Sequence, residues 1–193
     1  MALWGITDAD EAKPKWLSTA QKKEVFANNS GWVVEAGSTM TGNDNADAQP
    51  EVLCCIGDLA TGIGAADITE IEFITTAFDK SDGGNIDVRV RFNEQVTVNT
   101  SGGTPTLTIT NDTPARNLTA TYLSGSTTNE LVFRKTIAAA NAATNAGDVL
   151  SIGANPLALA SGTIKDTADG STNATITSVA SIGAAAGTIT VAA

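Results

Sequence analysis

The sequence contains no histidine among its 193 residues. This absence excludes Ser-His-Asp and Cys-His catalysis, histidine acid–base chemistry and histidine-ligated metal sites. Thiolate chemistry at Cys54 or Cys55 would need a nearby cation or base, and no lysine or arginine lies close to them in the sequence. We interpret the aspartates and glutamates as ordinary surface residues and not as paired catalytic carboxylates. We therefore predict no catalytic, cofactor-binding or metal-binding residue, and a protein that is not an enzyme.

Cysteine is scarce, and the only two residues of this type, Cys54 and Cys55, are adjacent. Neighbouring side chains in a strand point to opposite faces, so this pair cannot form the usual disulfide between two strands. Without histidine or further cysteine, the pair is also a poor metal site. We expect one cysteine to face a core and the other to face solvent.

Basic residues are few: 11 Lys and Arg stand against 21 Asp and Glu, which gives a net charge of −10. Such an acidic chain is unsuited to nucleic acid or to anionic membranes, because both are bound mainly through Lys and Arg. The N-terminus shows no basic stretch followed by an apolar run, and no apolar run approaches the ~18 residues of a membrane span. We expect no signal peptide, no membrane or nucleic-acid partner, and folding in a cytosol.

Aromatic residues make up only 5% of the chain, and most of the apolar residues are small or β-branched. Short apolar runs alternate with Gly- and Asn-rich turns from Ile68 onward, a spacing typical of a β-sandwich. The clearest strand is Ile86–Asn93, in which every second residue is apolar. Strict alternation predicts one buried and one solvated face. We predict an all-β fold, with an immunoglobulin-like antiparallel β-sandwich over residues 67–193.

Residues 1–66 differ from the rest and are expected to form an N-terminal arm, a short helix and a β-hairpin. Ser18 and Gln21 have the spacing of a capping box, which predicts a helix of two or three turns ending at Asn28-Asn29. Apolar runs at 32–34 and 52–56 predict the hairpin, and the small residues at 57–66 predict a flexible linker.

The acidic stretch from Asp79 to Asp87 allows two interpretations. Its oxygen ligands around Gly83-Gly84 could hold Ca²⁺, although the spacing is not that of an EF-hand and Lys80 interrupts it. Asp82-Gly83-Gly84-Asn85 is also a good hairpin turn in its own right, and turn chemistry accounts for each residue. We predict the turn and leave calcium binding open.

The N-terminal region holds all three tryptophans, and a short arm cannot bury Trp4 and Trp16 against itself. They must pack on the downstream domain or on another protein. We select as candidate partner-binding residues Trp4, Trp16, Leu17, Phe26 and Trp32. Their alternative role is to fill a small core of this chain's own.

Four segments of the downstream region resemble a recurrent bacterial and viral Ig-like module. They are VRVRFNEQVTV (88–98), TPTLTITN (104–111), ATYLSGSTTNELVFRKTIAA (120–139) and SGTIKD (161–166). Arg134 and Lys135 are a local departure from that pattern. The resemblance covers more than half of the chain and implies the fold, but little of the function.

The start of the chain, MALWG…KPKWLS…KKEVF followed by GWVVEAG, resembles the N-termini of virion structural proteins of tailed phages of marine bacteria, cyanophages especially. This resemblance implies a virion component, made without a signal peptide in an infected cell. Its expected role is a capsid decoration protein whose arm binds the major capsid protein or another virion protein, and which self-associates. The alternatives are a neck, tail or fibre component, and an adhesive carbohydrate-binding module. An enzyme is the remotest alternative.

Overall fold

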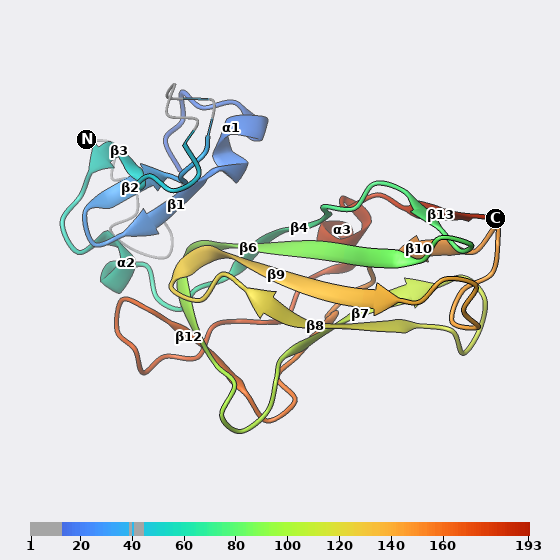
Figure 1. Cartoon of the computed structure of the whole chain (residues 1–193). Helices are drawn as coiled ribbons and strands as arrows, with labels where there is room; N and C mark the ends of the chain where they lie inside the picture. The colour runs from blue at the N-terminus through green and yellow to red at the C-terminus, as the bar shows by residue number, and fades with distance from the viewer. Residues whose placement is uncertain (1–12, 39, 41–44) are drawn as a thin grey trace.

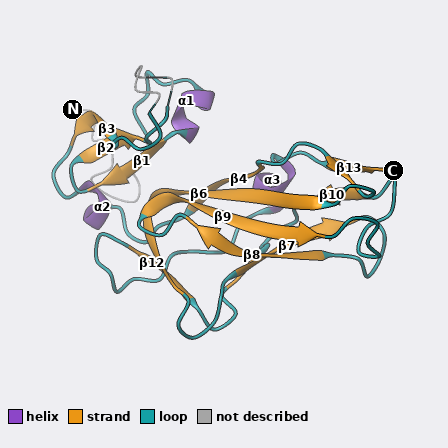
Figure 2. Ribbon diagram, viewed as in Figure 1, coloured by secondary structure: helices purple, strands orange, loops and turns teal. Residues whose placement is uncertain are grey.

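The computed structural model describes residues 13–38, 40 and 45–193, and within them the chain is mostly β-strand with three short helices (Figure 2). The predicted all-β, sandwich-like fold is confirmed. The immunoglobulin-like assignment stays a prediction. None of the described helices is long and apolar enough to cross a membrane.

The sandwich region is built from a long sheet of strands in the order β4-β6-β9-β8-β7, with short strands continuing from β7 to β10, β13 and β5 (Figure 1). Its elements are β4 (Ile68–Phe73), β5 (Phe78–Asp79), β6 (Gly84–Asn99), β7 (Thr106–Asn111), β8 (Leu118–Ser124), β9 (Thr128–Ile137), β10 (Val149–Ser151), β11 (Leu157–Ala158), β12 (Thr163–Asp166), α3 (Ala180–Ala184) and β13 (Ile189–Ala192). The named strands of this region pair antiparallel except β13 and β5, which are parallel, and an isolated parallel bridge joins Asp67 to Thr175.

The core of the sandwich uses the apolar face that the alternation in the sequence predicts. Ile86, Val88, Val90 and Phe92 of β6 are each at most 1% exposed. They pack in one cluster with residues of β9 and of the short strands, among them Phe133, Leu150, Ile189 and Val191. Burial of this apolar surface, at roughly 25 cal/mol per Å², is the main stabilising contribution to the sandwich.

The N-terminal unit, defined here as the described residues from 13 to 63, has a second core of its own. Its elements are α1 (Thr19–Lys23), β1 (Val25–Asn28), β2 (Gly31–Val34), β3 (Glu51–Cys55) and α2 (Leu59–Gly62). The buried members of this core are Leu17, Val25, Ala27, Trp32, Val34, Leu59 and Ile63. The predicted capping box between Ser18 and Gln21 is present, and β2 and β3 form the predicted antiparallel hairpin.

Two expectations for this region are wrong. The helix from Ser18 ends at Lys23, and residues 25–28 form β1 instead of further helical turns. Val25, Phe26 and Ala27 are all buried, so β1 carries no alternation by which a strand could be recognised. The stretch at 57–66 is not a flexible linker, because Leu59 and Ile63 of α2 pack into the small core.

The N-terminal unit sits at one end of the elongated sandwich, opposite the C-terminal strand (Figure 1). It joins the sandwich through a parallel bridge between Ala27 of β1 and Glu94 of β6. As a result, residues 90–94 of β6 are buried on both faces, and the prediction of a solvated outer face is wrong at Arg91 and Asn93. The expected domain boundary at residue 66 stays a prediction, although the small core ends at Ile63 and the large core begins at Ala66.

The turn between β1 and β2 depends on Gly31, whose φ of +133° is unfavourable for other residues. A β-carbon there would lie 2.0 Å from the carbonyl oxygen of Cys54. We expect Gly31→Ala to destabilise the N-terminal unit by roughly 1–3 kcal/mol, measured by chemical denaturation with tryptophan emission as the signal. All three tryptophans lie in residues 1–66, so this signal reports on that region.

Gly57→Ala is the matched control for this substitution. A β-carbon added at Gly57 would meet no atom within 4 Å beyond its chain neighbours, and the φ of Gly57 is not positive. We expect this variant to unfold as the wild type does, and equal losses in both variants would contradict the steric argument.

Candidate functional site at the junction of the two units

A cluster of charged side chains fills the junction between the N-terminal unit and the sandwich. Its centre is Arg91 of β6, whose side chain is 7% exposed. We define the Arg91 cluster as Arg91, Arg89, Glu70 and Glu72 of β4, Glu130 of β9, Glu35 after β2, and Lys23 of α1. The sandwich supplies most of these groups, and the N-terminal unit supplies Glu35 and Lys23.

The guanidinium of Arg91 contacts four carboxylates at once. Its Nη1 donates to Glu70 Oε2 at 2.7 Å and to Glu72 Oε1 at 3.2 Å. Its Nη2 donates to Glu35 Oε1 at 2.9 Å, and its Nε lies 2.6 Å from Glu130 Oε1. The Nε and Nη2 atoms share one edge of the guanidinium, so the carboxylates of Glu35 and Glu130 are brought side by side.

Two further cations partly balance these four carboxylates. Arg89 forms ion pairs with Glu72 and Glu130, and Lys23 forms one with Glu70. The Lys23–Glu70 and Arg91–Glu35 pairs connect the two units. The amide of Asn129 adds a hydrogen bond to Glu35 Oε2 at 3.2 Å.

This environment moves the pKa values of the cluster in opposite directions. Burial, followed by the neighbouring charge of Glu35, raises the pKa of Glu130. Hydrogen bonds from Lys23 and Arg91 outweigh burial at Glu70 and lower its pKa. Burial lowers the pKa of Lys13, which lies near Glu35 and Arg91, to about 8. Two glutamates of one cluster therefore respond to acid at different pH values.

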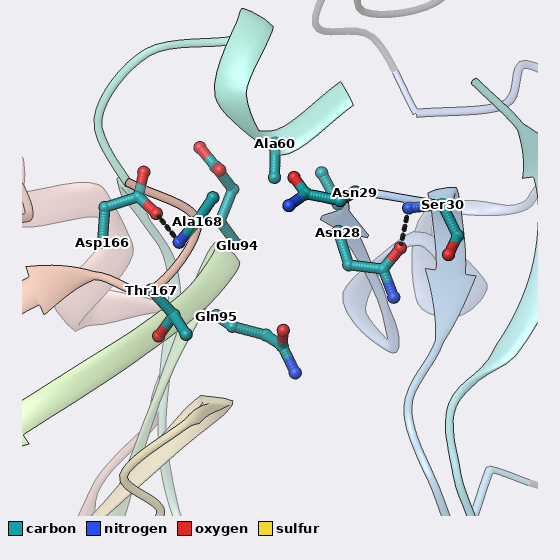
Figure 3. Close-up of a pocket in the computed structure, with 10 residues that line it drawn as sticks. Asn28, Asn29, Ser30, Ala60, Glu94, Gln95, Asp166, Thr167 and Ala168 are labelled. Carbon is teal, nitrogen blue, oxygen red and sulfur yellow. Dashed lines mark hydrogen bonds between the residues drawn. The ribbon is translucent and has the colours of Figure 1, made fainter. Parts of the chain in front are cut away.

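A pocket of about 280 Å³ also lies at the junction (Figure 3). Asn28, Asn29 and Ser30 line it from the N-terminal unit, and the carboxylates of Glu94 and Asp166 line it from the sandwich. Burial raises the pKa of Asp166, which accepts a hydrogen bond from the backbone of Ala168 at 2.6 Å. The lining is polar and holds neither a lysine nor a cysteine that could act as a nucleophile.

The candidate partner-binding residues are placed differently from one another. Trp16 is 59% exposed, just before α1. Leu17 and Trp32 are buried in the small core, and Phe26 is 1% exposed on β1. These three residues therefore offer no surface to a partner in this structure, and Leu17 and Trp32 instead fill a core of this chain's own. Trp4 lies outside the described residues.

The other sequence candidates are also placed. Cys54 is partly buried against the small core and Cys55 is exposed; both are free thiols. The stretch from Asp79 forms a turn, in which the Asp79 carboxylate accepts from the backbone N–H of Ser81 at 2.7 Å. It does not connect a hairpin, because β5 pairs with β13 and not with β6. Among the described residues, no group of three or more His, Cys, Asp or Glu could hold a metal ion.

The junction itself was not predicted from the sequence. Arg91 lies in a strand among alternating apolar residues, which is the ordinary pattern of a solvated face. The available signal was the density of charge on that strand, because Arg89, Arg91 and Glu94 follow each other within six residues. Nothing in the sequence, however, shows that β1 covers this face.

No family model matches the sequence, and comparisons with curated proteins and with solved structures give no match.

Proposed function

We propose that the protein is a non-enzymatic virion structural protein that decorates a phage capsid and docks on it through its N-terminal unit. The observation that carries this proposal is the placement of Trp16. It is 59% exposed on a small unit with its own core, at one end of the sandwich (Figure 1). Exposed tryptophans are enriched among the residues that dominate protein–protein binding energies.

Charge and shape support the same proposal. The net charge of −10 favours solubility on a crowded particle surface. The elongated sandwich extends away from the N-terminal unit, so docking through that unit would leave the sandwich projecting outward (Figure 1). The resemblance of the first residues to virion proteins of marine phages supports the choice of partner, a major capsid protein.

The decisive experiment is to measure the copy number of the protein relative to the major capsid protein in purified virions, by quantitative mass spectrometry. A ratio approaching that of the shell protein supports capsid decoration. A much lower ratio would place the protein in the neck, tail or fibres. Absence from the particle would contradict the virion proposal and favour an adhesive module, for which glycan binding is the test.

Substitution of exposed tryptophan tests the docking surface. We expect Trp16→Ala to weaken binding to particles that lack the protein by at least about tenfold, in line with a loss of ~1.4 kcal/mol or more at a binding hot spot. Trp4→Ala should abolish binding in the same assay. Neither variant should change the melting of the sandwich, because Trp16 is not a member of its core and Trp4 is expected to belong to the docking arm.

Val179→Ala is the matched control for the docking assay. Val179 is 63% exposed on the sandwich, beside α3. The control variant should bind as the wild type does. Undiminished binding by both tryptophan variants would contradict docking through the N-terminal unit.

A further inference from the structure

Charged side chains supply several of the contacts that hold the two units together. The large and small cores are separate clusters, and the Arg91 cluster lies between them. An ion pair whose two partners belong to the same unit does not bind that unit to the other one. Besides the backbone bridge between Ala27 and Glu94, the side-chain contacts that cross the junction include Arg91–Glu35, Lys23–Glu70 and Asn129–Glu35.

Glu35 and Glu130 face each other across this junction. Both lie on the same edge of one guanidinium, Glu35 from the N-terminal unit and Glu130 from β9. Glu130 Oε1 is buried and makes no aligned hydrogen bond, although it lies 2.6 Å from Arg91 Nε. Two carboxylates held this close repel each other when both are ionised and bind each other when they share a proton.

We propose that the Arg91 cluster is a proton-dependent switch that controls docking of the N-terminal unit on the sandwich. Ionisation of the Glu35–Glu130 pair weakens docking as the pH rises toward neutral. Protonation of Glu70 weakens its pair with Lys23, and so weakens docking, as the pH falls into the acid range. A cavity of about 380 Å³, lined by Glu35 and Glu130 among others, lies beside the pair and gives protons access to it.

The sign of each contribution follows from its pKa. Glu130 has a raised pKa in the docked state, so its contribution to docking is complete below the ordinary value of 4.5 and is lost as the pH rises through the raised pKa. Glu70 has a lowered pKa, so its contribution is complete above 4.5 and is lost as the pH falls through the lowered pKa. Docking is therefore most stable at a pH between the lowered pKa of Glu70 and the raised pKa of Glu130, and it weakens on both sides.

The other charged groups at the junction do not reverse this result below pH 8. The groups facing the Glu35–Glu130 pair are Arg89 and Arg91 of β6, Glu70 and Glu72 of β4, Lys22 and Lys23 of α1, and Lys13. The arginines stay charged throughout. Lys13 has a pKa lowered to about 8 from 10.5, so its contribution favours docking only as the pH rises through that interval.

The experiment is native-state hydrogen exchange, read by mass spectrometry or NMR at the amides of β1 and Glu94, with intrinsic exchange rates corrected at each pH. We expect protection to peak between the lowered pKa of Glu70 and the raised pKa of Glu130, and to change by up to about tenfold per pH unit on either side, as one proton is linked to each side. Protection of the sandwich core strand β9 should not show this peak.

Three variants separate the two sides of the response. Glu130→Gln imitates the protonated carboxyl and should remove the loss of protection between pH 4.5 and pH 8. Glu70→Gln should remove the acid-side loss. Asp87→Asn is the matched control, because Asp87 pairs with Arg134 between the same two strands, β6 and β9, without contacting the N-terminal unit.

Several results would overturn the proposal. A flat protection profile in the wild type would do so, as would a Glu130→Gln variant that keeps the neutral-side slope. Where a variant fails to fold, the pKa of Glu130 can be measured in the wild type from its side-chain carboxyl ¹³C shift. A value at or below 4.5 would contradict the switch, and a value above it would support the switch.

Discussion

Arg91→Met is expected to lower the free energy of unfolding by about 3–5 kcal/mol at neutral pH, because it leaves buried carboxylates without their common cation. Four glutamates contact this guanidinium, and Glu70 is nearly as buried as Arg91 itself. Methionine keeps much of the apolar stem, so the loss reports on charge more than on packing. Chemical denaturation followed by circular dichroism measures the effect.

Arg134→Met is the matched control for this substitution. Arg134 also pairs with a carboxylate, that of Asp87, but its side chain is 37% exposed. An exposed ion pair contributes at most about 1 kcal/mol, so the control should lose no more than that. Equal losses in the free energy of unfolding of the two variants would show that burial of the Arg91 cluster does not increase its contribution to stability.

The Arg91→Met variant should also recover part of its stability in acid. Without the guanidinium, the surrounding glutamates have raised pKa values in the folded state and take up protons more readily than in the unfolded chain. Their stabilising contribution is then complete below their ordinary pKa and is lost as the pH rises through the raised values. The difference in the free energy of unfolding between Arg91→Met and the wild type should therefore decrease as the pH falls.

Trp32→Ala is expected to destabilise the N-terminal unit by about 3–5 kcal/mol, the usual cost of deleting a large buried aromatic side chain. Trp32 is completely buried and is the largest member of a core with few other residues. Such a small core cannot compensate for the cavity, so we expect the unit to unfold while the sandwich remains folded. Hydrogen exchange of β1 and β2, compared with β9, measures the two parts separately.

Two further variants define the origin of this effect. Trp16→Ala makes the same chemical change at a position that is 59% exposed, and should cost little. Trp32→Phe should retain most of the stability, because the buried indole Nε1 makes no hydrogen bond to any described residue that phenylalanine would lose. Unfolding of the sandwich together with the unit in Trp32→Ala would contradict independent cores.

The sequence predicted the sandwich core well, because one face of each strand there packs against the core and the other is polar. Ile86, Val88, Val90 and Phe92 were assigned to one buried face, and all four are buried. The capping box was equally readable, because it depends on residues three positions apart. Local patterns of this kind need no knowledge of the rest of the chain.

The candidate site could not be predicted, because it depends on contacts between distant segments. Glu35 and Arg91 are far apart in the sequence, and only the bridge between β1 and β6 brings them together. β1 itself has no alternation, since both of its faces are covered. The exposed position of Trp16 and the buried position of Trp32 likewise follow from the small core, which no local pattern reveals.

The pairing of β13 with β5 has a consequence for the order of folding. The backbone carbonyl of Ala193 accepts from the Ser81 hydroxyl across a separation of 112 residues, and Ile189 and Val191 belong to the large core. The sandwich can close only after these residues have left the ribosome. The described members of the small core lie within residues 17–63, so the N-terminal unit can form much earlier during synthesis. Glu35 and Lys23 of this unit can form their ion pairs with Arg91 and Glu70 only after the later strands have been made.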